Sequence, residues 1–293
     1  MDEFVVFNFL TDHGIPRSGS EAFLKQRMHS TLANRSPFLL NKFINKSVHL
    51  EEKLVDWCRN GCLAYTRERS EETACVFCKA ERFHASGRRA KTTRYWSIAA
   101  WLSMMLGNPN IGPDMMELMR TAREAAAAGS TSRDDWFNSD IFRMLLGQGK
   151  FSSDTDVAWS ISAYGFKAWR QGGFQGWPIT GTILSMPIST RLKIASQRLL
   201  TVTPGPREPK DLDSFLYPIM EELNILASGI GGLTVSGSDA LHVLRVFLVQ
   251  ITTDMPAGDK LIHAKGHNGM SPGRFWMFRG WWSVSYRHNY FPN

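Results

Sequence analysis

Two short stretches between residues 157 and 184 decide the fold that we expect. Residues 157–164 read Val-Ala-Trp-Ser-Ile-Ser-Ala-Tyr, and residues 177–184 read Trp-Pro-Ile-Thr-Gly-Thr-Ile-Leu. Both stretches alternate apolar with small or polar residues, which is typical of β-strands. Residues 192–203 form a third candidate strand, which the Pro-Gly-Pro of residues 204–206 ends. The sequence therefore predicts three consecutive strands between residues 157 and 203.

A helix and a further apolar segment follow these strands. Apolar residues recur at helical spacing over residues 211–226, although Pro218 fits only near the first turns and favours a start later than Asp211. A glycine-rich turn at 229–237 precedes an apolar stretch, 241–251, which leads to Asp254. Three strands, a helix and an apolar segment ending in an acid are the order in which an RNase H-like fold begins. In that fold, carboxylates on the first and fourth strands hold two Mg²⁺ ions for phosphoryl transfer.

Length and composition exclude several classes of protein. The chain has 293 residues, of which 43% are hydrophobic and 21% charged, so it can bury a core as one large domain or two ordinary ones. The best apolar run, residues 95–106, is 12 residues long and is too short to span a membrane. The first residues, Met-Asp-Glu, are acidic where a secretory signal is basic. We therefore expect neither a membrane protein nor a small secreted disulfide-rich domain.

The cysteines are confined to one short segment. All four of them, Cys58, Cys62, Cys75 and Cys78, fall in a C-x3-C and a C-x2-C pair separated by twelve residues. Four thiolates at this spacing can surround a tetrahedral Zn²⁺ ion in a closed, structural site. Two disulfides are the alternative, but they suit a small secreted domain better than this chain. We expect a zinc knuckle whose intervening residues, 63–74, form a short hairpin.

Positive charge is also localised. The formal net charge is +7, and the segment 79–94 alone contributes +5, as does the segment 260–293. Such clusters favour a polyanionic partner, because each neutralised phosphate releases a counterion; the alternative is a solvated basic face. Since the first cluster directly follows Cys78, we expect it to bind DNA through its six basic residues, namely Lys79, Arg82, Arg88, Arg89, Lys91 and Arg94.

The remaining segments complete the predicted α/β (α+β) organisation. We expect an N-terminal helical region at 1–57, with a capping box at Ser18 and Glu21, and the zinc knuckle with its basic tail at 58–94. A helical region with a linker at 129–135 follows at 95–150, with helices near 96–107 and 114–128. Residues 151–272 form the partial RNase H-like core, and 273–293 a divergent basic aromatic tail. No small-molecule or nucleotide motif is present in the chain.

Five ordered stretches carry a resemblance to a known family. Residues 203–223 (TPGPREPKDLDSFLYPIMEEL) resemble a PGPKxPxDxDxFLxPLxEEL stretch, and residues 156–166 (DVAWSISAYGF) a DIALGLSTDGF stretch followed by a WPI like that at 177–179. Residues 248–256 are similar to LxxxFGDxPA, residues 265–272 to KGHNGISP, and residues 58–78 to a CxxxCxxYTG…CPYC knuckle. Together they resemble eukaryotic CACTA-type (En/Spm-like) DNA transposases.

The resemblance implies a nuclear DDE-type transposase with an RNase H-like core, a divalent metal such as Mg²⁺, and DNA as its partner. An intact transposase copy is a further candidate partner. However, Tyr164 stands where the family has its first catalytic Asp, and a neutral phenol cannot replace a carboxylate as a Mg²⁺ ligand. A Cys-x-x-Cys pair that follows residue 272 in the family is also missing, and the third acid is not found in this chain.

The remaining acids are candidates for the second carboxylate. We prefer Asp254, which follows the predicted helix; Asp211 and Asp213 precede that helix and are weaker candidates, because helix capping also explains them. We expect a truncated, degenerate transposase that binds DNA and does not recombine it. The alternatives are a domesticated zinc-binding adaptor for nucleic acid or protein without catalysis, and a non-functional relic open reading frame.

Overall fold

The computed structural model describes residues 52–132, 134–167, 175–193, 196–203, 209–263, 281–285 and 287–290. The chain divides into two compact units, Met1–Glu52 and Lys53–Asn293. The helical region predicted for residues 1–51, with its capping box, lies outside the described residues. Residues 52–56 were included in that helical prediction, which is wrong for them: they form strand β1 (Glu52–Asp56). The reason is the burial of Val55 and Trp57 on one side of an extended segment that pairs with β2 (Thr92–Trp96).

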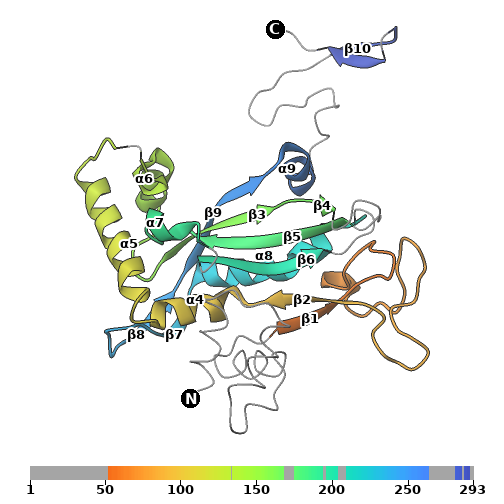
Figure 1. Ribbon diagram of the computed structural model, residues 1–293, viewed down its shortest axis with the longest axis horizontal. Helices are drawn as coiled ribbons and strands as arrows, with labels where there is room; N and C mark the ends of the chain where they lie inside the picture. Colours follow the sequence, from red (N-terminus) through yellow and green to blue (C-terminus); the bar gives the residue numbers. More distant parts are fainter. Residues whose placement is uncertain are drawn as a thin grey trace, which may run out of the picture. The chain divides into compact units, whose positions relative to one another are not determined.

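A mixed sheet forms the centre of the second unit (Figure 1). Its strands are β3 (Val157–Ala163), β5 (Gln175–Ile183), β6 (Gln197–Thr203) and β9 (Val246–Thr253), with the short β4 (Phe166–Lys167) extending the β3–β5 hairpin. The order is β6-β5-β3-β9, in which β5 is antiparallel to both β6 and β3, and β9 is parallel to β3. The three predicted strands are thus present and paired as consecutive antiparallel neighbours, although the third begins at Gln197 and not at residue 192.

Helix α8 (Asp213–Ser228) connects the antiparallel strands to β9, and Figure 1 shows it passing behind β5 and β6. Its buried residues recur at helical spacing and include Phe215, Ile219, Leu223 and Leu226. The helix begins two residues after Asp211 and contains Pro218 as its sixth residue. The predicted helix is therefore confirmed, with the later start that the proline favours.

The strand β3 is buried along both of its faces. Trp159 packs edge-on against Trp101 of helix α4 (Ile98–Gly107), with ring centroids 5.7 Å apart. On the neighbouring strand, a Cβ at Gly181 would lie 1.9 Å from the Trp159 ring, so only glycine fits beneath the indole. The adjacent residue, Ala158, belongs instead to a cluster that includes Phe142 and Phe151. This alternation explains the apolar and small residues of the 157–164 stretch.

The helices of the middle region pack into the same core as the sheet. They are α5 (Gly112–Ala127), η2 (Trp136–Asn138) and α6 (Asp140–Gly147). Met119 and Phe142 from this region share one apolar cluster with Ala158 and Leu184 of the sheet region. In addition, Asp135, within the predicted linker, forms an ion pair of 2.9 Å with Arg191 of helix α7 (Ile188–Arg191). Residues on both sides of position 150 therefore belong to one packed unit.

The segment after α8 differs from the prediction in one respect. The glycine-rich stretch contains strand β7 (Ile230–Thr234), which pairs with β8 (Leu241–Leu244) in a hairpin, because Leu233 and Leu244 are buried. The apolar stretch expected at 241–251 is consequently two strands, β8 and β9. Helix α9 (Met255–Leu261) follows β9, and a second hairpin, β10 (Trp281–Ser283) with β11 (His288–Tyr290), lies in the C-terminal tail. Within the described residues, no helix is long and apolar enough to cross a membrane.

Candidate metal centre and the carboxyl edge of the sheet

Each cysteine pair lies in a tight turn closed by one β-bridge. The bridge Trp57–Ala64 closes the first knuckle, residues 57–64, and the bridge Ala74–Glu81 closes the second, residues 74–81. In the second knuckle, the N–H of Cys75 donates to the carbonyl of Ala80 (2.9 Å) and that of Lys79 to the carbonyl of Cys75 (2.8 Å). Lys79 has a φ of 61°, a left-handed conformation that the tight turn imposes. The hairpin expected at 63–74 is replaced by these two turns and a 3-10 turn, η1 (Arg67–Arg69).

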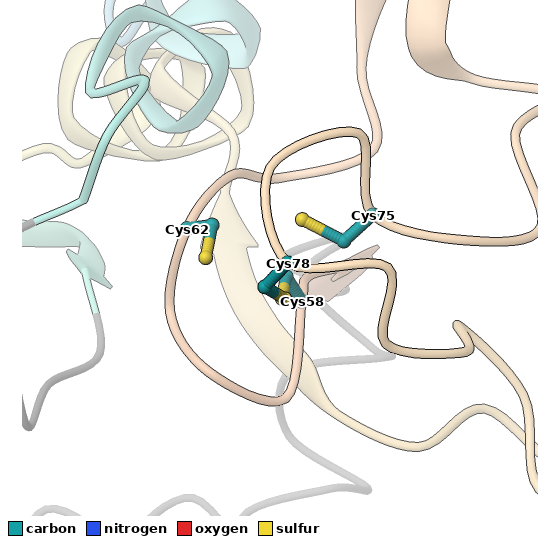
Figure 2. A group of neighbouring side chains, drawn as sticks. All are labelled: Cys58, Cys62, Cys75 and Cys78. Atoms are coloured by element: carbon teal, nitrogen blue, oxygen red, sulfur yellow. The ribbon is translucent and has the colours of Figure 1, made fainter.

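The two knuckles bring the four thiols together, as Figure 2 shows. The four sulfur atoms of Cys58, Cys62, Cys75 and Cys78 all lie within 4.8 Å of one another. Tetrahedral zinc with Zn–S bonds of about 2.3 Å requires sulfur atoms that are about 3.8 Å apart, so the cluster needs little rearrangement to hold one ion. The four cysteines are not paired as disulfides. They form a group that could bind a metal such as zinc, as predicted.

Burial and hydrogen bonds set the electrostatics of the cluster. Burial raises the pKa of the Cys58 and Cys62 thiols, and neighbouring cysteines raise that of Cys62 further. For Cys78, burial acts in the same direction, but hydrogen bonds from the Ala80 N–H and the Asn60 amide, with those of Cys58 and Cys75, lower the pKa to about 6. The Asn60 amide donates to the Cys78 sulfur at 3.3 Å. The thiolate form is therefore favoured at Cys78, whereas Cys58 and Cys62 need a neighbouring cation before they ionise readily.

The first knuckle is attached to the start of α8 by its own backbone. The carbonyl of Cys62 accepts hydrogen bonds from the N–H groups of Lys210 (2.9 Å) and Asp211 (3.0 Å). The N–H of Ala64 donates to the Ser214 hydroxyl at 2.8 Å. Pro218 has no N–H to give to the Ser214 carbonyl four residues earlier, and the Thr66 hydroxyl donates to that carbonyl instead, at 2.7 Å. The hydroxyl that follows the first knuckle thus supplies the hydrogen bond that Pro218 cannot make within α8.

The six basic residues predicted to bind DNA do not have the same environment. Arg82 is mostly enclosed: it donates to the buried carboxylate of Asp56 at 2.9 and 2.7 Å and to the carbonyl of Ser70. Its guanidinium also lies over the Tyr65 ring, 4.7 Å from the centroid. Arg82 is therefore engaged in holding the knuckle together. The other five residues are exposed; they are Lys79, Arg88, Arg89, Lys91 and Arg94.

Within this segment, residues 83–89 form a turn that projects basic side chains. Phe83 and Arg89 form a bridge, and the N–H of His84 donates to the carbonyl of Arg88 at 2.8 Å. Arg59 of the first knuckle fastens this turn, because its guanidinium donates to the carbonyls of Glu81 (3.0 Å) and Phe83 (2.8 Å). The basic segment is thus tied to the cysteine cluster by side-chain and backbone hydrogen bonds.

Tyr164 and Asp254 lie side by side at the carboxyl ends of β3 and β9. The two strands are parallel, and Ala163 is paired with Thr253, so the next residue on each strand occupies an adjacent position. We call this pair of positions the carboxyl edge. Tyr164 is exposed, and the carboxylate of Asp254 accepts a hydrogen bond from the N–H of Ala257 at 2.8 Å, which makes Asp254 the N-cap of α9.

Asp211 and Asp213 have partners of their own. The Asp211 carboxylate accepts from the N–H of Ser214 at 3.0 Å and lies 3.6 Å from the Arg69 guanidinium. Asp213 is hydrogen-bonded to the ring Nε2 of His263 at 3.0 Å. In the part of the chain that the structure describes, the cysteines are the only group of three or more potential metal ligands that lie together. The structure therefore does not assemble these two acids with Asp254 into a ligand set.

Sequence reasoning missed one polar residue with a central role. The Glu222 carboxylate accepts from the Ile98 N–H (2.9 Å), the Ala99 N–H (3.0 Å) and the Ser97 hydroxyl (2.5 Å), and also from the Tyr95 hydroxyl. It caps the N-terminus of α4 from another helix, where negative charge is favourable. Burial and the neighbouring Glu222 charge raise the pKa of Tyr95. Glu221 and Glu222 belong to the 203–223 stretch that resembles the transposase motif, which marks them as candidates for a role. Nothing in the neighbouring sequence identifies the start of α4 as the partner of Glu222.

Comparison with known proteins adds no identification. No protein-family model matches this chain, and no curated protein matches it.

Proposed function

We propose that this chain is a transposase-related DNA-binding protein that acts in the nucleus and does not cut or join DNA. In this proposal, Cys58, Cys62, Cys75 and Cys78 hold one Zn²⁺ ion. Four protein thiolates complete a tetrahedral shell and leave no position for substrate, so the ion supplies a structural cross-link. The support for zinc is the chemistry of the donor set and the closeness of the four sulfur atoms.

We also propose that the sheet is the first part of an RNase H-like core. The support is the strand order β6-β5-β3-β9. In this sheet, β5 is antiparallel to both β3 and β6, and β9 is parallel to β3. A helix, α8, precedes the parallel strand, as in that fold. The support for the family is the set of five stretches that resemble CACTA-type transposases.

The absence of strand transfer follows from the residues at the carboxyl edge. Two-metal phosphoryl transfer needs carboxylates that clamp the ions beside the reacting phosphate. One of the two adjacent positions holds Tyr164, which offers a phenol oxygen where a hard cation prefers a carboxylate. The other, Asp254, uses a carboxylate oxygen to cap α9. This pair does not provide the set of fixed oxygens that Mg²⁺ requires before it gives up its water.

The observation that carries the DNA-binding function is the exposed basic turn that the cysteine cluster holds in place. Residues 79–94 have a net charge of +5, and five of the six cations are exposed while Arg82 and Arg59 fix the backbone beneath them. A rigid cationic turn neutralises phosphates at a low cost in conformational entropy. Contacts of this kind position a protein on DNA with little sequence preference.

A titration of the zinc-loaded full chain with a labelled DNA duplex of about 20 base pairs tests the proposal. We expect the logarithm of the affinity to fall linearly with the logarithm of salt concentration, by about 0.9 per phosphate contacted. The double variant Arg88→Glu/Arg89→Glu should lose most of the binding. Lys150→Glu/Lys193→Glu, at two exposed lysines elsewhere, serves as a control with the same change in charge. Salt-independent binding, or equal loss in both variants, would contradict the proposal.

A zinc-loaded chain that binds no DNA would instead fit the alternative function, an adaptor for another macromolecule.

A further inference from the structure

A hollow lies on the surface between the first knuckle and α8. Its volume is about 240 Å³, and its wall is formed by β1, the residues that follow the first knuckle, parts of the basic segment and one face of α8. The charged side chains of the wall are four cations and two carboxylates, namely Lys53, Arg67, Arg82, Arg89, Asp56 and Glu221. The hollow is therefore distinct from the exposed turn at residues 83–89, although Arg89 belongs to both.

The charges in the wall are not balanced. Asp56 is buried, and two nitrogens of Arg82 contact one of its carboxylate oxygens, Oδ2, at 2.9 and 2.7 Å. Arg89 lies 3.3 Å from the second oxygen of the same carboxylate, and half of its side chain is still exposed. Two cations thus share the single negative charge of Asp56, and the exposed half of the Arg89 side chain can contact an additional anion.

Two further cations lie at the rim. Lys53 and Arg67 are exposed and have no ion pair within the described residues. Arg67 is held over the Tyr217 ring, 5.0 Å from its centroid, and Tyr217 in turn donates its hydroxyl to Glu221 at 2.7 Å. The backbone of Arg67 has a φ of 55°, a left-handed conformation that is unfavourable for a residue with a side chain. The four cations and two carboxylates of the wall thus give it a net charge of +2.

We propose that this hollow binds a backbone phosphate of DNA, held by Lys53, Arg67 and Arg89. The inference rests on the proposed DNA-binding function and extends the interface to two residues outside the 79–94 segment. Guanidinium groups bind phosphate through paired N–H donors, and a lysine adds a point charge. Since Arg89 borders both the hollow and the basic turn, one strand of DNA contacts both sites. The net positive charge of the wall favours an anion over any neutral ligand.

The test compares two double variants of the zinc-loaded full chain. Lys53→Gln/Arg67→Gln removes the rim cations, and Lys150→Gln/Lys193→Gln removes two exposed lysines elsewhere. Binding of a labelled 20-base-pair duplex is measured by fluorescence anisotropy over a range of salt concentrations. We expect the rim variant to bind roughly tenfold more weakly at low salt and to lose about 1 from the salt slope, which corresponds to one phosphate contact. The control should change both values little. Single Arg67→Gln should show about half of the effect.

Three other outcomes would overturn this inference, and they separate a failure of the proposed function from a failure of the hollow as a phosphate site. If the unaltered chain does not bind the duplex, the proposed function fails and the hollow has no DNA ligand. If the unaltered chain binds with a salt-dependent affinity but the rim variant behaves like the control, only the inference about the hollow fails. If inorganic phosphate displaces the duplex from the unaltered chain more than chloride at equal ionic strength, and does not do so from the rim variant, the hollow takes free phosphate instead.

Discussion

The cysteine cluster and the carboxyl edge are both positioned by well-formed backbone, but they differ in the residues that this backbone carries. At the cluster, each of the four positions that the two knuckles bring together holds a thiol. At the carboxyl edge, the register between β3 and β9 makes two positions neighbours, yet they hold Tyr164 and Asp254. Strand register depends on many apolar residues and backbone hydrogen bonds, whereas a ligand set depends on single side chains. A scaffold can therefore be complete where its chemistry is not.

The largest effect is expected when one thiol is removed from the cysteine cluster. The variant Cys75→Ser should lose bound zinc, fall from one ion per chain to well under one, and lose several kcal/mol of stability, because a structural zinc site contributes its binding free energy to folding. Elemental analysis and thermal unfolding measure the two effects. The exposed Ser86→Ala serves as a control in the same segment. Unaltered protein that contains no zinc, with a melting temperature that a chelator does not change, would contradict the assignment.

A second prediction concerns the cap that Glu222 provides. Glu222→Ala leaves the first N–H groups of α4 and the Ser97 and Tyr95 hydroxyls without their acceptor, and should cost roughly 3 kcal/mol. The matched control is Glu221→Ala, one residue earlier on the same helix, where the carboxylate is exposed and, among the described residues, accepts a hydrogen bond from Tyr217. Chemical denaturation of both variants measures the difference. Equal losses would show that Glu222 is not acting as a cap.

A smaller effect is expected where the first knuckle meets α8. Thr66→Val removes the hydroxyl that donates to the Ser214 carbonyl and should cost roughly 1–2 kcal/mol. In a Pro218→Ala background, the new N–H can donate to the same carbonyl, so the same change should cost less. The free energies of unfolding of the four proteins form a double-mutant cycle. Additive effects would show that the hydroxyl does not replace the bond that the proline omits.

The sequence predicted the local elements that depend on periodic patterns. The alternation over 157–164 and 177–184 and the helical spacing over 211–226 correspond to β3, β5 and α8. The spacing of the four cysteines also predicted that they lie together. These signals are local, because burial on one face imposes a period on the chain itself.

What the sequence did not reveal depends on contacts between distant residues. The link between Glu222 and residues 95–99, and that between Asp56 and Arg82, join positions with no common pattern. The helical pattern of the preceding residues predicts a helix that includes 52–56, whereas pairing with β2 decides the conformation of these residues. Likewise, Arg82 was counted as a DNA contact on charge alone, and its enclosure by Tyr65, Asp56 and Ser70 only appears in the folded chain.

The smallest expected effect tests the carboxyl edge directly. Tyr164→Asp restores the acid that the resembling family carries at this position, and the register places it beside Asp254. We expect neither the unaltered chain nor this variant to nick supercoiled DNA in the presence of Mg²⁺ or Mn²⁺. Two carboxylates, one of which caps α9, hold a hard cation weakly, because several fixed oxygens are needed to replace its water. An agarose-gel nicking assay on both proteins measures this.

The control for that assay is Asp254→Ala, which removes the cap of α9. It should cost about 1 kcal/mol of stability and leave the nicking assay unchanged, since the role that the structure shows for this carboxylate is its hydrogen bond to the Ala257 N–H. The opposite result is informative in a specific way. Metal-dependent nicking by the unaltered chain that disappears in Asp254→Ala would make Asp254 a catalytic residue. It would also mean that the carboxyl edge is functional despite Tyr164, and the contrast with the cysteine cluster would no longer hold.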